Sequence, residues 1–375
     1  MQPLSLIDVV DTPEGEITAR HYHTGEGVRI TWKDGKIAAI APAPLSPDTP
    51  WVAPALVDLQ VNGYGGTDFL RDEVNEEGLL KAARALRRDG CARFLLTVIT
   101  RRWTELMAHL KRIKAIRDGN PELRKAILGW HVEGPFISPQ PGFVGAHDSN
   151  VALEADPSPE AIDLLKEVVG DDPTMITVGG ERNGVVAAIR RARELGIVVS
   201  LGHTNASRCQ IDEAVKAGAE AFTHLGNGCP QQLDRHDNIL WRVLDDSGLT
   251  AGIIPDTHHV SPQVFRLMHR LLPADKIYWT TDAMSGAGAP PGLYTLGALA
   301  IEVGEDRVAR QPGKQNFAGS ALEPLRGICL GAGMLDKPWQ AVWDYFSVNP
   351  ARVMNRNHQL AVGGEAIFCL LKENG

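Results

Sequence analysis

GIVVSLGHTNASRCQIDEAVKAGAEAFTH, residues 196–224, contains a strand, a helix and a second strand in succession. The apolar runs near its two ends are typical of buried strands. Between them, Ser207 can cap a helix whose apolar residues recur three and four apart until Gly218 ends it. This unit recurs from residue 52 to about residue 282, which predicts a (β/α)₈ TIM-type barrel, with an open doubly wound sheet as the alternative. The expected strands are 51–61, 91–99, 126–133, 174–180, 196–203, 219–224, 249–256 and 276–283, and the expected helices include 76–90, 158–170, 184–195, 207–218 and 261–273.

The two ends of the chain do not follow this rhythm. VRITWKDGKIAAIAP, residues 28–42, predicts a hairpin that turns at Lys33–Asp34–Gly35, and GGEAIFCLLKENG, residues 363–375, predicts one or two short strands. We therefore expect residues 1–51 and 358–375 to form a small β-sandwich subdomain beside a barrel domain of residues 52–357.

The composition narrows the class of protein. The 375 residues carry a net charge of −8, with 43% hydrophobic and 22% charged residues, which argues against a general nucleic-acid or acidic-membrane surface. The five cysteines are scattered without a CxxC pair, which is typical of a reducing compartment. The N-terminal stretch lacks a basic region before an apolar run, and no stretch approaches the roughly 20 apolar residues of a membrane span. We expect a soluble cytoplasmic protein that binds neither nucleic acid nor membrane.

Polar side chains stand where the predicted strands end, and in such barrels the chemistry gathers at the carboxyl ends of the strands. In VDLQVNG, residues 57–63, Asp58, Gln60 and Asn62 alternate with apolar residues, which predicts one polar face. His131 and Glu133 alternate in the same way at the end of the third strand. Each histidine or aspartate alone is more often a core residue or a helix cap, but so many at successive strand ends favour metal chemistry. Glu133, His203 and His224 would be three ligands of a divalent transition metal, with water completing the shell, and Asp282 would be the proton carrier.

Several of these stretches also match a known family. The matching segments are DLQVNGYGGTDF (58–69), HVEGPFISP (131–139), GAH (145–147), GHTNAS (202–207), THLGN (223–227), DTHHV (256–260), TDAM (281–284) and FAGS (317–320). In these the chain resembles the N-acetylglucosamine-6-phosphate deacetylases of the amidohydrolase superfamily, over nearly its whole length. The resemblance implies metal-dependent hydrolysis of N-acetyl-D-glucosamine 6-phosphate to D-glucosamine 6-phosphate and acetate, a step of amino-sugar catabolism.

The resemblance also implies roles for individual residues. Amidohydrolases usually carry His-x-His at the end of the first strand, and here those positions read Gln60–Val61–Asn62. Amides are poor transition-metal ligands, so we expect one divalent metal per subunit, with zinc favoured and iron, cobalt or manganese as alternatives. Gln60 and Asn62 would then bind water or substrate. Asp282 would take a proton from the attacking water and return it to the leaving amine, and His147 would donate to the carbonyl oxygen.

The sequence departs most from the family in the segments expected to recognise the substrate. By resemblance, Arg235 and His259 would hold the sugar phosphate, with Arg235 reaching the neighbouring site of a homodimer, and Asn227 and Gly228 would contact the phosphate or the sugar hydroxyls. The family commonly reads THLFNAM and then Arg-Glu-Pro-Gly, whereas this chain reads THLGNGCP and then Arg235–His236–Asp237–Asn238. A different N-acetyl hexosamine, either another epimer or an unphosphorylated one, therefore stays open.

Two further readings stay open as well. An amidohydrolase acting on a cyclic amide or an N-acyl amino acid usually keeps His-x-His and often a bridging modified lysine, and Glu133 in the place of that lysine argues against it. A metal-containing sugar-phosphate-binding protein without turnover would need the metal ligands but would have no use for Asp282.

Overall fold

Eight parallel strands form the central sheet of the computed structural model, which describes residues 4–245, 247–313 and 317–374. They pair in chain order: β6 (Leu56–Val61), β9 (Cys91–Ile99), β10 (Ile127–Glu133), β11 (Thr174–Val178), β12 (Val198–Leu201), β13 (Ala219–Phe222), β14 (Thr250–Ile253) and β15 (Ile277–Trp279). The first and last strands also meet, because Val61 forms a parallel bridge with Ala283 and the Asn62 N–H donates to the Ala283 carbonyl at 2.7 Å. The predicted (β/α)₈ barrel is confirmed.

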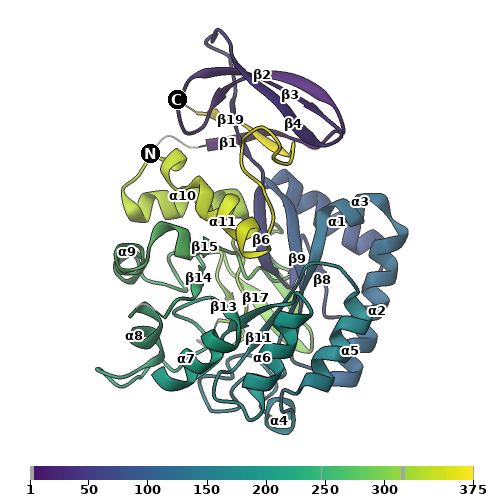
Figure 1. The fold of residues 1–375 in the computed structure, drawn as a ribbon, viewed down its shortest axis with the longest axis vertical. Helices are drawn as coiled ribbons and strands as arrows, with labels where there is room; N and C mark the ends of the chain where they lie inside the picture. The colour runs from purple at the N-terminus through teal and green to yellow at the C-terminus, as the bar shows by residue number, and fades with distance from the viewer. Residues whose placement is uncertain (1–3, 246, 314–316, 375) are drawn as a thin grey trace.

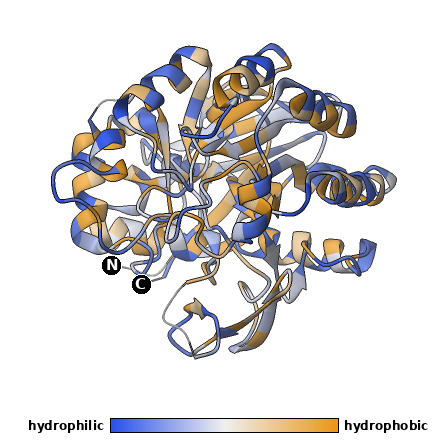
Figure 2. Cartoon of the chain, turned by 90° about the horizontal axis from the view of Figure 1, so that it is seen from below, coloured by the Kyte–Doolittle hydropathy of each residue, from blue (hydrophilic) through white to orange (hydrophobic). Residues whose placement is uncertain are grey.

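Helices surround these strands, with their hydrophobic faces turned towards the sheet (Figures 1 and 2). In α1 (Glu76–Arg88), Asn75 caps the first turn, Glu76 and Glu77 lie at the positive end of the helix dipole, and Leu79, Ala82 and Leu86 are buried. The other helices are α2 (Trp103–Gly119), α3 (Pro121–Ala126), α4 (Ser149–Glu154), α5 (Pro159–Val169), α6 (Val185–Glu194), α7 (Arg208–Ala217), α8 (Ile239–Leu244), α9 (Pro262–Leu271), α10 (Pro324–Leu335) and α11 (Val348–Val353). Within residues 4–245, 247–313 and 317–374, no helix combines the length and apolarity that crossing a bilayer requires.

Apolar side chains fill one end of the barrel interior. Val57 and Leu59 of β6 pack there with side chains from five other strands and from the end of α11: Leu95, Met175, Val198, Ala221, Tyr278, Ala351 and Met354. Because this end is filled with apolar side chains, the polar side chains of the interior lie towards the opposite rim, where the strands end.

The prediction that Asp58, Gln60 and Asn62 share one polar face of residues 57–63 is wrong. The pairing of β6 with β9 shifts register between Asp58 and Val61, so the alternation is interrupted, and Val61 packs in a different apolar cluster from Val57. The Asp58 carboxylate instead accepts hydrogen bonds from the hydroxyls of Thr280 and Thr281, at 2.5 and 2.6 Å. Asp58 thus ties the first strand to the end of the last, while Gln60 and Asn62 reach the rim.

A six-stranded sheet lies at the top of the barrel in Figure 1, built from both ends of the chain. Its order is β1 (Leu4–Val10), β19 (Phe368–Glu373), β5 (Trp51–Pro54), β2 (Gly15–His21), β3 (Gly27–Lys33) and β4 (Lys36–Pro42). The predicted hairpin at Asp34 and Gly35 is confirmed, with both residues at positive φ, 53° and 68°. Residues 51–54, expected at the start of the first barrel strand, instead pair with β19 and β2 as strand β5.

The sequence analysis did not predict a small antiparallel sheet after β15. Its strands are β16 (Gly292–Leu296), β17 (Leu299–Val303) and β18 (Ala309–Arg310), and a separate pair is formed by β7 (Gly63–Tyr64) and β8 (Thr67–Asp68). The Asp68 carboxylate joins the two by accepting from the Thr295 hydroxyl at 2.6 Å and the Gly297 N–H at 2.8 Å. The stretch from Ala283 to Ala287 is buried and bonded to residues 62–66, so the glycine-rich sequence there is a packed part of the rim.

Candidate metal centre and active site

Three imidazoles converge on one carboxylate at the rim of the barrel. Glu133 is the last residue of β10, while His203 and His224 each follow the end of their strand by two residues. His224 Nε2 lies 2.8 Å and His203 Nε2 3.3 Å from the same oxygen, Glu133 Oε1. His147, from the loop after β10, places Nε2 3.7 Å from the other oxygen, Oε2. All four side chains are at most 7% exposed, so the polar cluster is sealed from bulk solvent.

The backbone turns sharply where these side chains leave their strands. His203, His224 and Asp282 have φ values of 49°, 32° and 52°, in the left-handed region that residues with a side chain rarely adopt. Such positions cost about 1–3 kcal/mol each and concentrate at functional sites. The same unusual turn at three strand ends directs these residues towards the rim.

The loop around His147 and the loop after His224 hold the ring of His203. His203 Nδ1 lies 2.7 Å from the Phe143 carbonyl. A carbonyl only accepts, so Nδ1 carries the proton and the lone pair is on Nε2, facing Glu133. Gly145 and Gly228, at φ 60° and 61°, press against the ring: a methyl group added at either would lie 2.9 Å from a ring atom. Sequence reasoning included Gly228 for its backbone but missed Phe143 and Gly145, which lie in an aperiodic loop.

The donor atoms fit a divalent transition metal. Ligand atoms of Glu133, His147 and His203 all lie within 4.8 Å of one another, and His224 contacts Glu133 directly. One carboxylate with several imidazoles is the ligand chemistry that zinc and similar ions take in proteins. The predicted set names His224 as the third ligand, whereas the closest geometric group has His147 in that place.

The electrostatics of the cluster favour an ionised Glu133 carboxylate. Burial alone would raise the pKa of Glu133, but the imidazoles of His203, His224 and His147 around it hold this pKa well below its usual value. Burial, together with the nearby His203, lowers the pKa of His147 to about 3. Burial lowers the pKa of His224, but its hydrogen bond to Glu133 and the charges of Glu133 and Asp282 together outweigh burial, and the net shift is upward.

Asp282 lies beside this cluster and has a different electrostatic environment. Asn62 Nδ2 donates to Asp282 Oδ1 at 2.7 Å. Burial and, second to it, repulsion by the Glu133 carboxylate raise the pKa of Asp282 to about 7. His224, His259 and the hydrogen bond from Asn62 lower this pKa, but by less. A carboxyl with such a pKa can both accept and return a proton near neutral pH.

Buried polar atoms without a partner surround the same rim. Among the described residues these include Gln60 Nε2, Asn62 Oδ1 and His224 Nδ1. Buried polar groups are rarely left unpaired in proteins, and unpaired ones cluster where water, an ion or a ligand completes the site. Gln60 and Asn62 are each 2% exposed, so their free atoms point into the polar interior.

His131 belongs to a hydrogen-bonded chain inside the barrel. Its Nδ1 lies 2.9 Å from the Leu59 carbonyl and its Nε2 2.7 Å from the Thr177 hydroxyl, which in turn contacts Thr223, and Thr223 contacts Ser200. Burial lowers the pKa of His131 to about 4, so the ring is neutral. The chain links β6, β10, β11 and β12 with the residue that follows β13. Sequence reasoning named His131 but not its partners, because each of them alone is an ordinary core hydroxyl.

The residues predicted to bind the substrate lie in two groups. His259 Nδ1 is 2.6 Å from Asp256 Oδ2, and His259 lies near enough to Asp282 to affect the pKa of that carboxyl. Asn227 contacts the His224 carbonyl with its side chain at 3.4 Å, and Gly228 contacts His203. Both therefore border the cluster.

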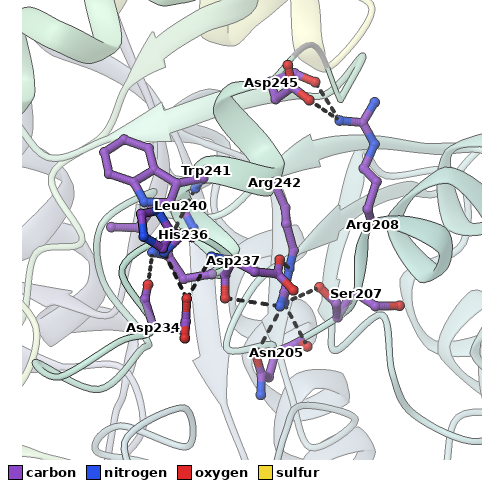
Figure 3. A network of polar contacts seen from close by, with 12 residues as sticks. Asn205, Ser207, Arg208, Asp234, His236, Asp237, Leu240, Trp241, Arg242 and Asp245 are labelled. Atoms are coloured by element: carbon purple, nitrogen blue, oxygen red, sulfur yellow. Dashed lines mark hydrogen bonds and ion pairs between the residues drawn. The ribbon is translucent and has the colours of Figure 1, made fainter.

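Arg235 lies in the loop before α8, where its carbonyl accepts from Trp241 Nε1 at 3.2 Å; Figure 3 shows its neighbours Asp234, His236 and Asp237. The side chain of Arg235 is exposed, and in the described part of the chain its guanidinium makes no hydrogen bond or ion pair. The loop itself is well anchored: the Asp234 carboxylate accepts from the backbone N–H groups of His236 and Asp237. Arg242 donates to Asp237 at 2.6 Å and to carbonyls of the segment after His203.

Comparisons with known proteins give a consistent result. No family model matches the chain. The N-acetylgalactosamine-6-phosphate deacetylase of Escherichia coli O157:H7 is 32% identical over 351 residues, which cover 90% of this chain and 89% of that protein. The N-acetylglucosamine-6-phosphate deacetylase of Danio rerio is 30% identical over 339 residues, covering 86% and 80%. A mutant of the Mycobacterium smegmatis deacetylase, in complex with N-acetyl-D-glucosamine-6-phosphate, superposes with a TM-score of 0.83 at 26% identity, over 96% of this chain and 95% of that one.

Proposed function

Since the chain belongs to the N-acetylglucosamine-6-phosphate deacetylase family of amidohydrolases, we propose that it hydrolyses the acetamide of a 6-phosphorylated N-acetyl hexosamine. Acetate and the free amino sugar phosphate are the products. N-acetyl-D-glucosamine 6-phosphate is the first candidate substrate, because most of the relatives are named for it.

The convergence of Glu133, His203 and His224 beside Asp282 carries this proposal. A set of candidate metal ligands next to a buried carboxyl is the arrangement that metal-assisted hydrolysis requires, and a mere binding protein has no need of that carboxyl. The cluster lies at the carboxyl ends of the barrel strands, the end at which the active sites of such barrels are found.

We assign one divalent ion, preferably zinc, to Glu133, His203 and His224. When bound, such an ion lowers the pKa of water and polarises a carbonyl. The fixed lone pair of His203 and the shared oxygen of Glu133 support this set. Gln60 and Asn62 support a single ion, because amides replace the imidazoles that a second ion would need.

The protons are handled by two residues in this proposal. Asp282 accepts the proton of the attacking water with the oxygen that Asn62 leaves free, and it later protonates the departing amine. His147 donates a hydrogen bond to the acetyl oxygen as negative charge develops there.

We propose that Arg235 and His259 bind the phosphate and that Asn227 and Gly228 contact the sugar. A guanidinium fork suits two phosphate oxygens. Because Arg235 is exposed and unpaired among the described residues, we propose that it serves the site of a second subunit in a homodimer. An apolar stretch on α8 and α9 supports such an assembly: Trp241, Val264, Leu267 and Leu271 are 44%, 38%, 43% and 53% exposed.

A second candidate substrate is N-acetyl-D-galactosamine 6-phosphate, the C4 epimer. The E. coli O157:H7 relative named for it is 32% identical to this chain over nine tenths of its length. Gly226 and Gly228 stand where the family commonly has larger side chains, in the segment after His224. A change of side-chain size there would alter which sugar epimer the site accepts.

Acetate release from a small panel of sugars tests the proposal. The panel contains N-acetylglucosamine and N-acetylgalactosamine, each with and without the 6-phosphate, and the zinc-loaded Asp282→Asn protein serves as the negative control. We expect release from a phosphorylated member and little from its unphosphorylated counterpart. Absence of release from all four sugars would refute the proposal and favour a binding protein or another amidohydrolase.

We further propose that the protein is cytoplasmic and that residues 1–51 and 358–375 fold as a subdomain beside the barrel of 52–357. All five cysteines are free thiols in the structure, which supports a reducing compartment. The separate six-stranded sheet supports the division, although β5 shows that its edge lies close to residue 55.

A further inference from the structure

The Thr100 hydroxyl contacts the outer nitrogen of His147. Thr100 directly follows β9 at the rim, and its Oγ1 lies 2.8 Å from His147 Nδ1. The position is closely fitted, because a methyl group added at Gly134 would lie 2.2 Å from this hydroxyl oxygen. A side chain at residue 134 would therefore displace Thr100 from the histidine.

The partner of Nδ1 decides which nitrogen of a neutral imidazole carries the hydrogen. For His203 the partner is the Phe143 carbonyl, so the hydrogen sits on Nδ1 and the lone pair on Nε2 faces the cluster. For His147 the partner is a hydroxyl, which can donate. In the part of the chain that the structure describes, this hydroxyl has no other hydrogen-bond partner, so donation to Nδ1 is what satisfies its own proton.

We propose that Thr100 is a positioning residue that holds His147 with its hydrogen on Nε2. That hydrogen then points into the site, where it donates to the acetyl oxygen of the substrate. In this tautomer Nε2 has no lone pair, so His147 cannot bind a metal through Nε2. His224 is then the third metal ligand. This inference rests on the proposed deacetylation.

Nitrogen NMR of the zinc-loaded protein tests the tautomer without any turnover. Long-range ¹H–¹⁵N spectra of ¹⁵N-histidine-labelled protein distinguish protonated from unprotonated ring nitrogens, and the signals missing from His147→Asn identify those of His147. We expect a protonated Nε2 in the wild type and in Thr100→Ser, and a mixture of tautomers in Thr100→Val. A protonated Nδ1, or a zinc-bound Nε2, in the wild type would overturn the proposal.

Kinetics provide the second measurement. Removing a hydrogen-bond partner that orients a site histidine typically costs about 10- to 100-fold in activity. We expect Thr100→Val to lower kcat by that factor with KM little changed, and Thr100→Ser to keep most of the wild-type kcat. In a protein that already carries His147→Asn, adding Thr100→Val should lower kcat no further. Thr97→Val, three residues earlier on β9, is the matched control: it deletes a hydroxyl that accepts from the Val61 N–H and is expected to leave the His147 tautomer unchanged.

The outcomes separate this inference from the proposed function. If the wild type releases acetate and Thr100→Val does so equally well, the role of Thr100 is refuted while the deacetylase assignment stands. If no acetate is released from any sugar, the proposed function fails, and the role of His147 in donating to the substrate fails with it.

Discussion

A single methyl group at Gly145 should separate the stability of the fold from the integrity of the metal site. In Gly145→Ala the new methyl would lie 2.9 Å from His203 Cε1 and 3.4 Å from Nδ1. Carbon atoms in contact prefer about 3.5–4.0 Å, so the ring must move by about half an ångström or more. This movement would strain the 2.7 Å hydrogen bond between His203 and the Phe143 carbonyl.

Gly196→Ala is the control for the backbone. Gly196 has φ 72°, close to the 60° of Gly145, but nothing lies within 4 Å of a methyl group added there. Both variants therefore carry the cost of a side chain in the left-handed region, about 1–2 kcal/mol, offset in part by the lower entropy of the unfolded chain, about 0.4–1 kcal/mol. We expect Gly196→Ala to lower the free energy of unfolding of the metal-free protein by roughly 1 kcal/mol, and Gly145→Ala to lower it somewhat more because the ring of His203 must also move.

Only the Gly145 variant should bind metal more weakly. Disturbing the support of a metal-binding histidine typically costs about 10- to 100-fold in metal affinity. Urea unfolding gives the stability of each metal-free protein, and competition with a chromophoric chelator gives its zinc affinity. If Gly145→Ala binds zinc within about twofold of Gly196→Ala, the glycine has no part in placing His203 and our account of the site is wrong.

Three further outcomes are expected. Asp282→Asn should keep its metal, measured by elemental analysis, but lose acetate release by at least about 100-fold; a metal-containing variant with normal turnover would contradict the proton role. Arg235→Ala should raise KM for the phosphorylated sugar about tenfold or more, because a charged hydrogen bond is lost, and leave any activity on the unphosphorylated sugar unchanged; equal effects on both would exclude a phosphate contact. Burial lowers the pKa of His269 to about 4, while its Nε2 accepts from Trp279. The unfolded chain therefore binds the extra proton first, near pH 6.5, so the free energy of unfolding should fall by up to about 3 kcal/mol as pH drops from 6.5 to 4. Urea unfolding should show a shallower fall for His269→Gln, and identical slopes would refute this.

The sequence predicted those parts of the site that follow the periodicity of the barrel. Glu133, His203, His224 and Asp282 stand where apolar strands end, and parallel strands of a barrel end at the same rim. For that reason the positions of these four residues, as well as the barrel, could be inferred before any coordinates.

What escaped prediction depends on irregular backbone. The bulge in β6 breaks the alternation that seemed to join Asp58 to Asn62, and no side-chain pattern in VDLQVNG marks it. Phe143 and Gly145 act through a loop whose path is set by tertiary contacts. The position of Thr100 at the rim could have been predicted, because it directly follows β9. A single threonine in a sequence, however, does not indicate a functional role.

Strand β19 has a consequence for how the protein is made. It lies between β1 and β5, so the last of this sheet's own strands to be synthesised occupies its interior. While the polypeptide emerges from the ribosome, the barrel strands are complete some ninety residues before β19 is available, and until then β1 and one edge of β5 have no partner in that sheet. Nascent chains should thus pass through a stage with a closed barrel and exposed strand edges, and a shortened product that lacks residues 368–373 would keep them and tend to aggregate.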